Sequence, residues 1–177
     1  YRASDGKDLG QSPFGYLDVT ADGKHVFSAG ARYDVDYTDA TAARYSFDIA
    51  GSAPIDAQNH RDTATNIDGS RVYSASGYPY NFPRYNGLTF DTQGALPGTY
   101  YPNNVELGSD GRVHCASDVG SDEDVWIYDA DGFLVDSFRA SASSYVRART
   151  LQVSADGFIS ILAVGSNNNE LIFRVVN

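Results

Sequence analysis

Short runs in which apolar and polar residues alternate follow one another along this chain, and four of them end at an Asp-Gly pair. A second alternating run begins two or three residues after each pair. Alternation with a period of two is typical of a half-buried β-strand, and the glycine supplies the positive φ that a tight turn needs. The pattern therefore predicts four β-hairpins, with turns at Asp22-Gly23, Asp68-Gly69, Asp110-Gly111 and Asp156-Gly157.

These hairpins recur with a regular period, since successive Asp-Gly pairs are 46, 42 and 46 residues apart. The first strands are predicted at 17–20, 63–66, 105–108 and 151–154, and the second strands at 26–29, 72–75, 113–116 and 159–162. After a loop, a third strand is predicted at 44–49, 86–91, 124–129 and 170–176. Four units of this kind at a period of about 45 residues indicate a β repeat architecture and fit the blades of a propeller.

Two stretches carry a resemblance to a known family, namely Asp124-Val-Trp-Ile-Tyr-Asp-Ala-Asp-Gly132 and Ser109-Asp-Gly-Arg-Val-His-Cys-Ala116. They resemble the blade repeats of the YVTN/lactonase-like and quinoprotein-like β-propellers, although the Tyr-Val-Thr-Asn string and the usual proline of the turn are missing. The resemblance covers nearly the whole chain. It implies an all-β fold, a β-propeller built from four blade repeats of about 45 residues, either complete or as half or a fragment of a larger propeller.

We expect residues 1–177 to form a single propeller-type domain. Its repeats would span about 12–50, 51–93, 94–131 and 132–177, with 1–11 as a strand that closes the ring. Two alternatives stay open. The chain could be half of an eight-bladed ring that a homodimer closes, or a piece of a longer propeller.

The composition excludes some classes of partner. The net charge is −10 and only two residues are lysine, which disfavours nucleic acid and anionic membranes because both attract basic surfaces. No apolar run is long enough to predict a membrane span. The single cysteine, Cys115, excludes an internal disulfide bond. A chain without any methionine is what processing would leave, and we expect a secreted, periplasmic or cell-surface location.

The resemblance also implies where a ligand would bind. In a propeller, the loops that enter the first strands and the loops between second and third strands share one face. Tyrosine, phenylalanine and arginine in these loops suit a protein or a glycan, although the same aromatic residues could simply pack the blade ends. The predicted ligand-binding face consists of Tyr33, His60, Arg61, Tyr78, Tyr80, Phe82, Arg84, Tyr101, Arg147 and Arg149.

The histidines differ in what they suggest. His60 and Arg61 together could bind an anion or transfer a proton, or His60 could only bond a neighbouring loop. His114 occupies the same position of its repeat as Phe27 and Tyr73, which favours a structural role.

No linear motif of an enzyme is present, and no acidic cluster completes a calcium loop, so we expect no cofactor and no bound metal. We therefore favour a non-enzymatic binding or scaffold module of a secreted or cell-surface protein. A fragment or subunit of a lactonase-like or quinoprotein-like enzyme is the first alternative. A purely structural repeat of a larger surface protein is the second.

Overall fold

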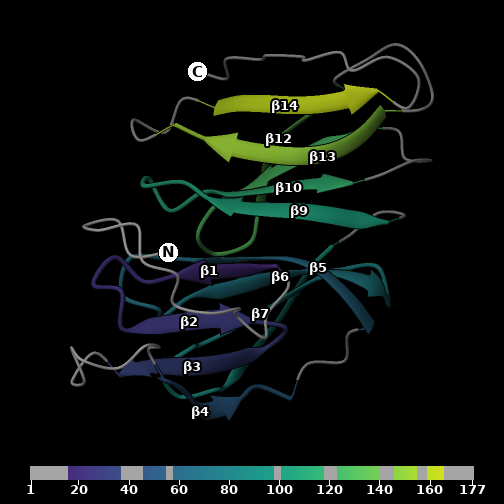
Figure 1. Ribbon diagram of the computed structural model, residues 1–177. Coiled ribbons are helices and arrows are strands. Elements are labelled where there is room, and N and C mark those ends of the chain that lie inside the picture. Colours follow the sequence, from purple (N-terminus) through teal and green to yellow (C-terminus); the bar gives the residue numbers. More distant parts are fainter. Residues whose placement is uncertain are drawn as a thin grey trace.

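The protein is built from antiparallel β-sheets that follow one another along the chain (Figure 1). The computed structural model describes residues 16–36, 46–54, 58–97, 101–117, 123–139, 146–154 and 159–165. The first two sheets contain β1 (Leu17–Val19), β2 (His25–Ser28), β3 (Ala31–Asp36) and β4 (Ser46–Ser52), then β5 (Gln58–Thr65), β6 (Val72–Tyr78), β7 (Phe82–Tyr85) and β8 (Thr92–Leu96). The others contain β9 (Pro102–Leu107), β10 (Val113–Ser117), β11 (Val125–Tyr128) and β12 (Leu134–Phe138), then β13 (Val146–Val153) and β14 (Ile159–Gly165).

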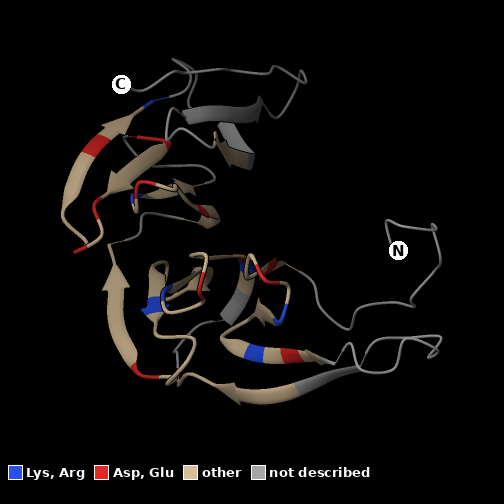
Figure 2. Cartoon of the chain, turned by 90° about the vertical axis from the view of Figure 1, so that its left-hand side faces the viewer, with Lys and Arg blue, Asp and Glu red and all other residues tan. Residues whose placement is uncertain are grey.

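Each four-stranded sheet is a meander in which consecutive strands pair, as in a propeller blade. We call the sheets blades one to four in chain order; of blade four the structure describes β13 and β14. The first strands β1, β5, β9 and β13 are the inner strands, and each of the first three contacts the inner strand of the next blade. Figure 2 shows the blades following one another along an arc. Among the described residues, no helix has the length and apolar character needed to cross a membrane.

All eight predicted first and second strands are confirmed, and three of the four predicted turns lie within the described residues. The turn glycines Gly23, Gly69 and Gly111 have φ of 69°, 75° and 82°. In each turn the aspartate side chain accepts a hydrogen bond from the backbone N–H two residues further on, for example Asp22 Oδ1 from Lys24 at 3.0 Å. The Asp-Gly pair suits these turns because the aspartate side chain accepts a backbone hydrogen bond within the turn and glycine tolerates the left-handed conformation. Asp156-Gly157 lies outside the described residues.

The prediction of the third strands was wrong in the first two blades. Residues 31–36, expected to be a loop, form β3, and 46–52 form the fourth strand β4. Ala29 and Gly30 (φ 50° and 81°) make a two-residue turn that leads directly from β2 into β3, and alanine at such a position gives no sequence signal.

Blade two has the same error. Residues 82–85 form β7 although they include a proline, and the predicted strand at 86–91 is the turn between β7 and β8, in which the Asn86 N–H donates to the Asp91 carbonyl at 2.9 Å. In blade three the third strand, β11, lies where it was predicted. The predicted strand at 170–176 and the closing strand at 1–11 lie outside the described residues.

Apolar contacts between neighbouring blades form the core. Phe27 on β2 is fully buried against Val72 and Tyr85 of blade two. Its ring fits there because Gly69 and Gly87 have no side chain; a Cβ on Gly87 would lie 2.3 Å from a ring carbon of Phe27. Tyr73 and His114 hold the corresponding positions in blades two and three, and Tyr73 lies in the core cluster between those two blades.

Polar contacts repeat between the inner strands as well. Asp18 on β1 accepts from its own neighbour Val19 N–H at 2.8 Å and from the Thr65 N–H of β5 at 2.7 Å. Asp62 on β5 does the same with Thr63 N–H at 3.0 Å and with the Val105 N–H of β9 at 3.1 Å. Each carboxylate thus links one inner strand to the next by accepting a backbone hydrogen bond across the blade boundary.

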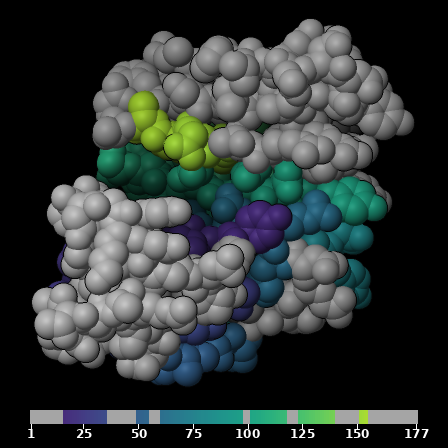
Figure 3. Space-filling model, in the orientation of Figure 1, coloured from purple at the N-terminus to yellow at the C-terminus, as the bar shows by residue number. Residues whose placement is uncertain are grey.

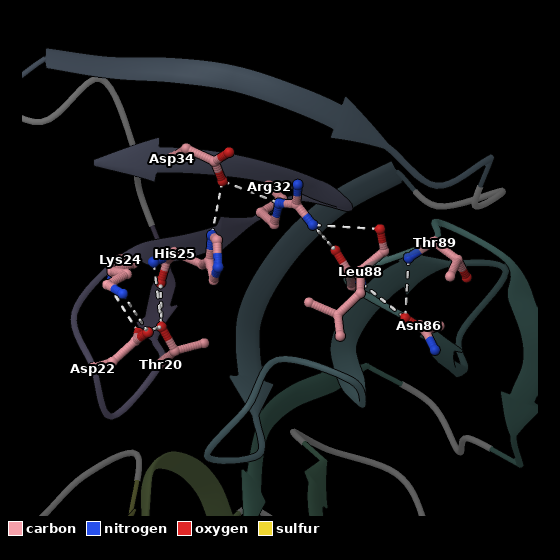
Figure 4. Close-up of polar contacts among 10 residues, drawn as sticks. Thr20, Asp22, Lys24, His25, Arg32, Asp34, Asn86, Leu88 and Thr89 are labelled. Atoms are coloured by element: carbon pink, nitrogen blue, oxygen red, sulfur yellow. Dashed lines mark hydrogen bonds and ion pairs between the residues drawn. The ribbon is translucent and has the colours of Figure 1, made fainter. Parts of the chain in front are cut away.

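Arginine provides a second link near the outside of blades one and two (Figure 4). Arg32 on β3 donates from Nη1 to the Gly87 carbonyl of blade two at 2.9 Å and from Nε to Asp34 at 3.1 Å. Its guanidinium also lies over the ring of Phe90, 5.1 Å from the ring centre. His25 contacts the same Asp34 carboxylate through Nδ1 at 2.8 Å, which holds that carboxylate in place for Arg32.

The tight packing of Phe27 predicts that Gly87→Ala destabilises the protein by about 2 kcal/mol, because a core that is already filled must move to accept a methyl group. Thermal unfolding followed by circular dichroism measures this. Gly94→Ala is the control, since its Cβ would meet nothing within 4 Å and costs only the strain of φ 79°, about 1 kcal/mol. An equal or smaller loss for Gly87→Ala would contradict the packing argument.

The burial of His114 predicts a loss of stability in acid. The ring is fully buried, and neither nitrogen has a hydrogen-bond partner among the described residues. Burial lowers its pKa from 6.5 to about 4. The unfolded chain therefore binds a proton at this residue before the folded one, and the contribution of His114 to stability should fall by about 3 kcal/mol as the pH drops from 6.5 to 4.

His114→Phe tests this, since phenylalanine already holds the corresponding position in blade one. The free energy of unfolding of the variant, relative to that of the wild type, should increase as the pH is lowered from 7 to 4, measured by urea titration. A difference between the two proteins that does not change with pH would contradict the assignment.

Candidate functional site

Three tyrosines and one arginine from the predicted face come together at one end of blades two and three. The rings of Tyr78 and Tyr80 meet edge to face, with centres 6.0 Å apart, and Tyr80 meets Tyr101 in the same way at 5.4 Å. The Arg61 guanidinium lies over the Tyr101 ring, 5.5 Å from its centre. Tyr78 and Tyr101 are 54% and 42% exposed, so the group reaches the surface. We call these four residues the tyrosine–arginine patch.

Backbone irregularities place the patch. The register between β5 and β6 shifts between His60 and Asp62, which leaves Arg61 as an extra residue. The inner strand β9 shifts in the same way around Asn103, and β13 shifts between Arg147 and Thr150. Such β-bulges bend a strand and redirect a side chain, and they are frequent next to functional sites. The bulges therefore recur at corresponding ends of three inner strands.

Two of the tyrosines also have an unusual backbone. Tyr80 and Tyr101 have φ of 62° and 59°, in the left-handed region that non-glycine residues seldom adopt. Residues held in this region concentrate at ligand-binding and active sites, where the surrounding structure compensates for the strain. The two ring positions are thus fixed by the backbone as well as by ring contacts.

His60 lies next to the patch but is half-buried. Its Nδ1 is buried and has no hydrogen-bond partner among the described residues, and burial lowers the pKa of the ring. The ring is therefore neutral near pH 7, which leaves Arg61 as the cationic group of the His60-Arg61 pair.

Three other members of the predicted face lie on strands, outside the tyrosine–arginine patch. Phe82 is fully buried in the core between blades two and three, because 82–85 is a strand rather than a loop. Arg84, on the same strand, donates to the Gln93 carbonyl at 2.6 Å and to the Asp131 carbonyl at 3.1 Å, and so links blade two to blade three. Tyr33 lies on β3 of blade one, opposite Val26 and Ile49. The side chains of Arg147 and Arg149 lie outside the described part of the structure.

A pocket that the sequence did not predict lies at the opposite ends of the same inner strands. It has a volume of about 520 Å³ and lies where β5, β9 and β13 end. Its lining residues flank the predicted Asp-Gly turns of successive repeats, and that shared spacing could have pointed to them. They are Thr65, Asn66, Ile67, Asp68, Arg71, Leu107, Gly108, Ser109, Gly111, Val153 and Ser154. We call this the axial pocket.

Carboxylates of the inner strands influence one another near this pocket. Glu106 on β9 precedes the pocket residue Leu107 and accepts from Gln152 Nε2 of β13 at 3.1 Å. Burial, with the negative charges of Asp62 and Asp18, raises the pKa of Glu106 to about 7. Burial also raises the pKa of Asp62. In the described ranges, no three His, Cys, Asp or Glu side chains are grouped so that they could hold a metal ion.

Comparison with known proteins identifies the architecture. No protein-family model matches the chain, and no curated protein matches its sequence. Among solved structures, hydrazine synthase of Kuenenia stuttgartiensis is similar to this chain, with a TM-score of 0.63 and 15% sequence identity. The match covers 97% of this chain and 53% of the hydrazine synthase chain. The WD40 β-propeller domain of Doa1 is also similar, with a TM-score of 0.59 and 14% sequence identity. That match covers 86% of this chain and 47% of the Doa1 chain.

The fold is that of a β-propeller. The prediction of an all-β propeller built from blade repeats is thereby confirmed, and at this level of identity the likeness concerns the fold alone. The narrower YVTN assignment is named by neither match and stays a prediction. This chain spans about half the length of the two solved structures it matches.

The raised pKa of Glu106 predicts that the contribution of this residue to stability falls as the pH rises from 4.5 to 7. In that window the folded state keeps a proton that the unfolded chain has released. Glu106→Gln keeps an oxygen that can accept from Gln152 and removes the charge. We expect it to stabilise the protein at pH 8 by about 2 kcal/mol, measured by urea titration.

Glu123→Gln is the matched control, because it makes the same chemical change outside the inner strands. At pH 4.5 the Glu106→Gln variant should differ little from the wild type. A pH-independent effect of Glu106→Gln would contradict the assignment.

Proposed function

We propose that this chain is a binding module that docks a protein partner on the tyrosine–arginine patch. The observation that supports the proposal is the contact of exposed Tyr78 and Tyr101 with Tyr80 and Arg61 at one end of two blades. Tyrosine and arginine are the residue types that supply most of the binding energy at protein interfaces. A secreted, periplasmic or cell-surface location belongs to the same proposal.

Preorganisation is the physical argument for this site. The rings already pack on one another, and the backbone of Tyr80 and Tyr101 is fixed, so little side-chain freedom remains to be lost on binding. The rigid blades behind the patch support loops that carry contacts, as in many binding proteins.

The ring arrangement favours a protein over a glycan. A sugar stacks on an open aromatic face, yet the guanidinium of Arg61 lies over the ring of Tyr101. Tyr78 and Tyr80 are inclined to each other by 79°, and Tyr80 and Tyr101 by 66°, so the three rings form an uneven surface rather than a flat platform. Such a surface suits side chains of a partner, including a carboxylate that pairs with Arg61.

The proposal predicts that peptides selected for binding to this chain use the patch. A phage-displayed library of random peptides would be selected on the wild type, and the affinity of the selected peptides measured by calorimetry. Tyr101→Ala and Arg61→Ala should each weaken binding at least about tenfold, the loss typical of an interface anchor. Phe133→Ala is the control, because Phe133 is an exposed aromatic residue on another part of blade three.

Two outcomes would contradict the proposal. Selected peptides that bind all four proteins equally would place the contact site elsewhere. A glycan array on which the wild type binds a sugar, with binding lost in Tyr101→Ala, would make the partner a glycan instead.

A further inference from the structure

The walls of the axial pocket combine apolar side chains from three successive blades. Ile67 comes from blade two, Leu107 from blade three and Val153 from blade four. In Figure 3 the surface recedes between the yellow-green segment, which is 151–154, and the purple segment at the start of the described chain. A volume of about 520 Å³ is in the range of small-molecule sites, which are mostly apolar with a few polar groups that orient the ligand. The walls therefore suit the apolar body of a small ligand.

One cationic side chain, that of Arg71, belongs to the described lining of this pocket. The cationic residues that follow the turns of the neighbouring blades are engaged, since Lys24 and Arg112 lie 3.9 Å and 3.5 Å from the aspartates of their own turns. In blade two the corresponding position is Ser70, and the cationic residue comes one place later. Among the described residues, the guanidinium of Arg71 takes part in no hydrogen bond or ion pair. Arg71 is thus a cation at a pocket wall without a partner from the described chain.

Hydrogen bonds fix the turn that carries Arg71. Asn66 accepts from the Arg71 N–H through Oδ1 at 2.9 Å and donates from Nδ2 to Ser70 Oγ at 3.0 Å. Asp68 Oδ1 accepts from the Ser70 N–H at 2.9 Å, and its hydrogen bonds with Ser70 lower the pKa of the Asp68 carboxyl. The side chains of Asn66 and Asp68 are therefore occupied within the turn, and the backbone of Arg71 is held in place before any ligand arrives. A fixed backbone lowers the entropy lost on binding.

We infer that the axial pocket binds a small organic carboxylate, with the carboxylate group on Arg71 and the apolar body against the three apolar side chains of the walls. A guanidinium binds a carboxylate through two parallel hydrogen bonds, which fixes the orientation of the ligand. A single negative charge fits better than the nearly two charges of a phosphate ester, because ionised Asp68 belongs to the same lining and the chain carries a net charge of −10. The inference does not rest on the proposed function, since the tyrosine–arginine patch lies at the opposite ends of the inner strands.

The test is ligand-observed NMR on the wild type with a set of small aromatic and medium-chain aliphatic monocarboxylates. Each acid is paired with its primary amide, which has nearly the same shape without the charge. Calorimetry then gives the affinity of each acid that binds. We expect at least one acid to bind, and its amide to bind at least about tenfold more weakly. Arg71→Ala should weaken binding of the acid to a similar extent, because the charge-assisted hydrogen bonds are lost.

Arg112→Ala is the matched control and should leave the affinity unchanged. Arg112 follows the turn of the next blade, pairs with Asp110 and does not line the pocket. Ile67→Glu places a negative charge on the pocket wall and should weaken binding of the acid at least about tenfold, because like charges repel. Ile67 is 75% exposed, so this variant should fold, which circular dichroism would verify.

Four outcomes would overturn the inference. The first is that no acid of the set binds at millimolar concentration. The second is that every acid that binds does so no more tightly than its amide, because the carboxylate would then not be recognised. The third is binding that persists unchanged in both Arg71→Ala and Ile67→Glu, which would place the site elsewhere. The fourth is tighter binding of phenyl phosphate than of any acid, with binding lost in Arg71→Ala, which would make the ligand a phosphate.

Discussion

The structure depends on the packing of one blade against the next. A four-stranded sheet has two faces, and when both are apolar each must be covered by a neighbouring sheet. Phe27 illustrates the constraint, since its ring enters blade two where Gly69 and Gly87 leave space, and no larger residue at Gly87 would allow the same approach. Contacts of this kind recur at each described boundary and set the distance between blades.

Hydrogen bonds add direction to this packing. Asp18 and Asp62 each accept from their own backbone neighbour and from the inner strand of the next blade, so the strands are held in a defined register. Arg32 and Arg84 make corresponding links farther out, each to backbone carbonyls of the following blade. Because backbone atoms are the partners, these links constrain the position of a strand with little dependence on its sequence.

The same boundaries bury groups that can carry charge. Glu106 and His114 are register partners on neighbouring strands, and burial favours the neutral form of both. The interior of blade three is therefore sensitive to pH in two opposite directions.

The tyrosine–arginine patch and the axial pocket lie at opposite ends of the inner strands, where turns and bulges interrupt the regular pairing. The rigid middle of each blade thus presents two separate surfaces.

The amino-acid sequence alone determined the hairpins. Alternation and Asp-Gly pairs are local signals, because the strand period and the turn conformation depend on a few adjacent residues. The sequence also pointed to Arg61, Tyr78, Tyr80 and Tyr101, although through a resemblance. It misplaced the third strands of blades one and two, since the turn at Ala29-Gly30 and the proline in β7 carry no clear local signal.

Only the tertiary structure decided which of the candidate residues meet. Phe82 and Arg84 are close to Tyr80 in sequence, yet one is buried in the core and the other links two blades. The 44% exposure of Leu17 was equally hidden, because the corresponding residues of the other blades, Thr63, Val105 and Leu151, are buried. What covers a residue depends on the neighbouring blade, which lies more than 40 residues away in the chain and leaves no trace in the local pattern.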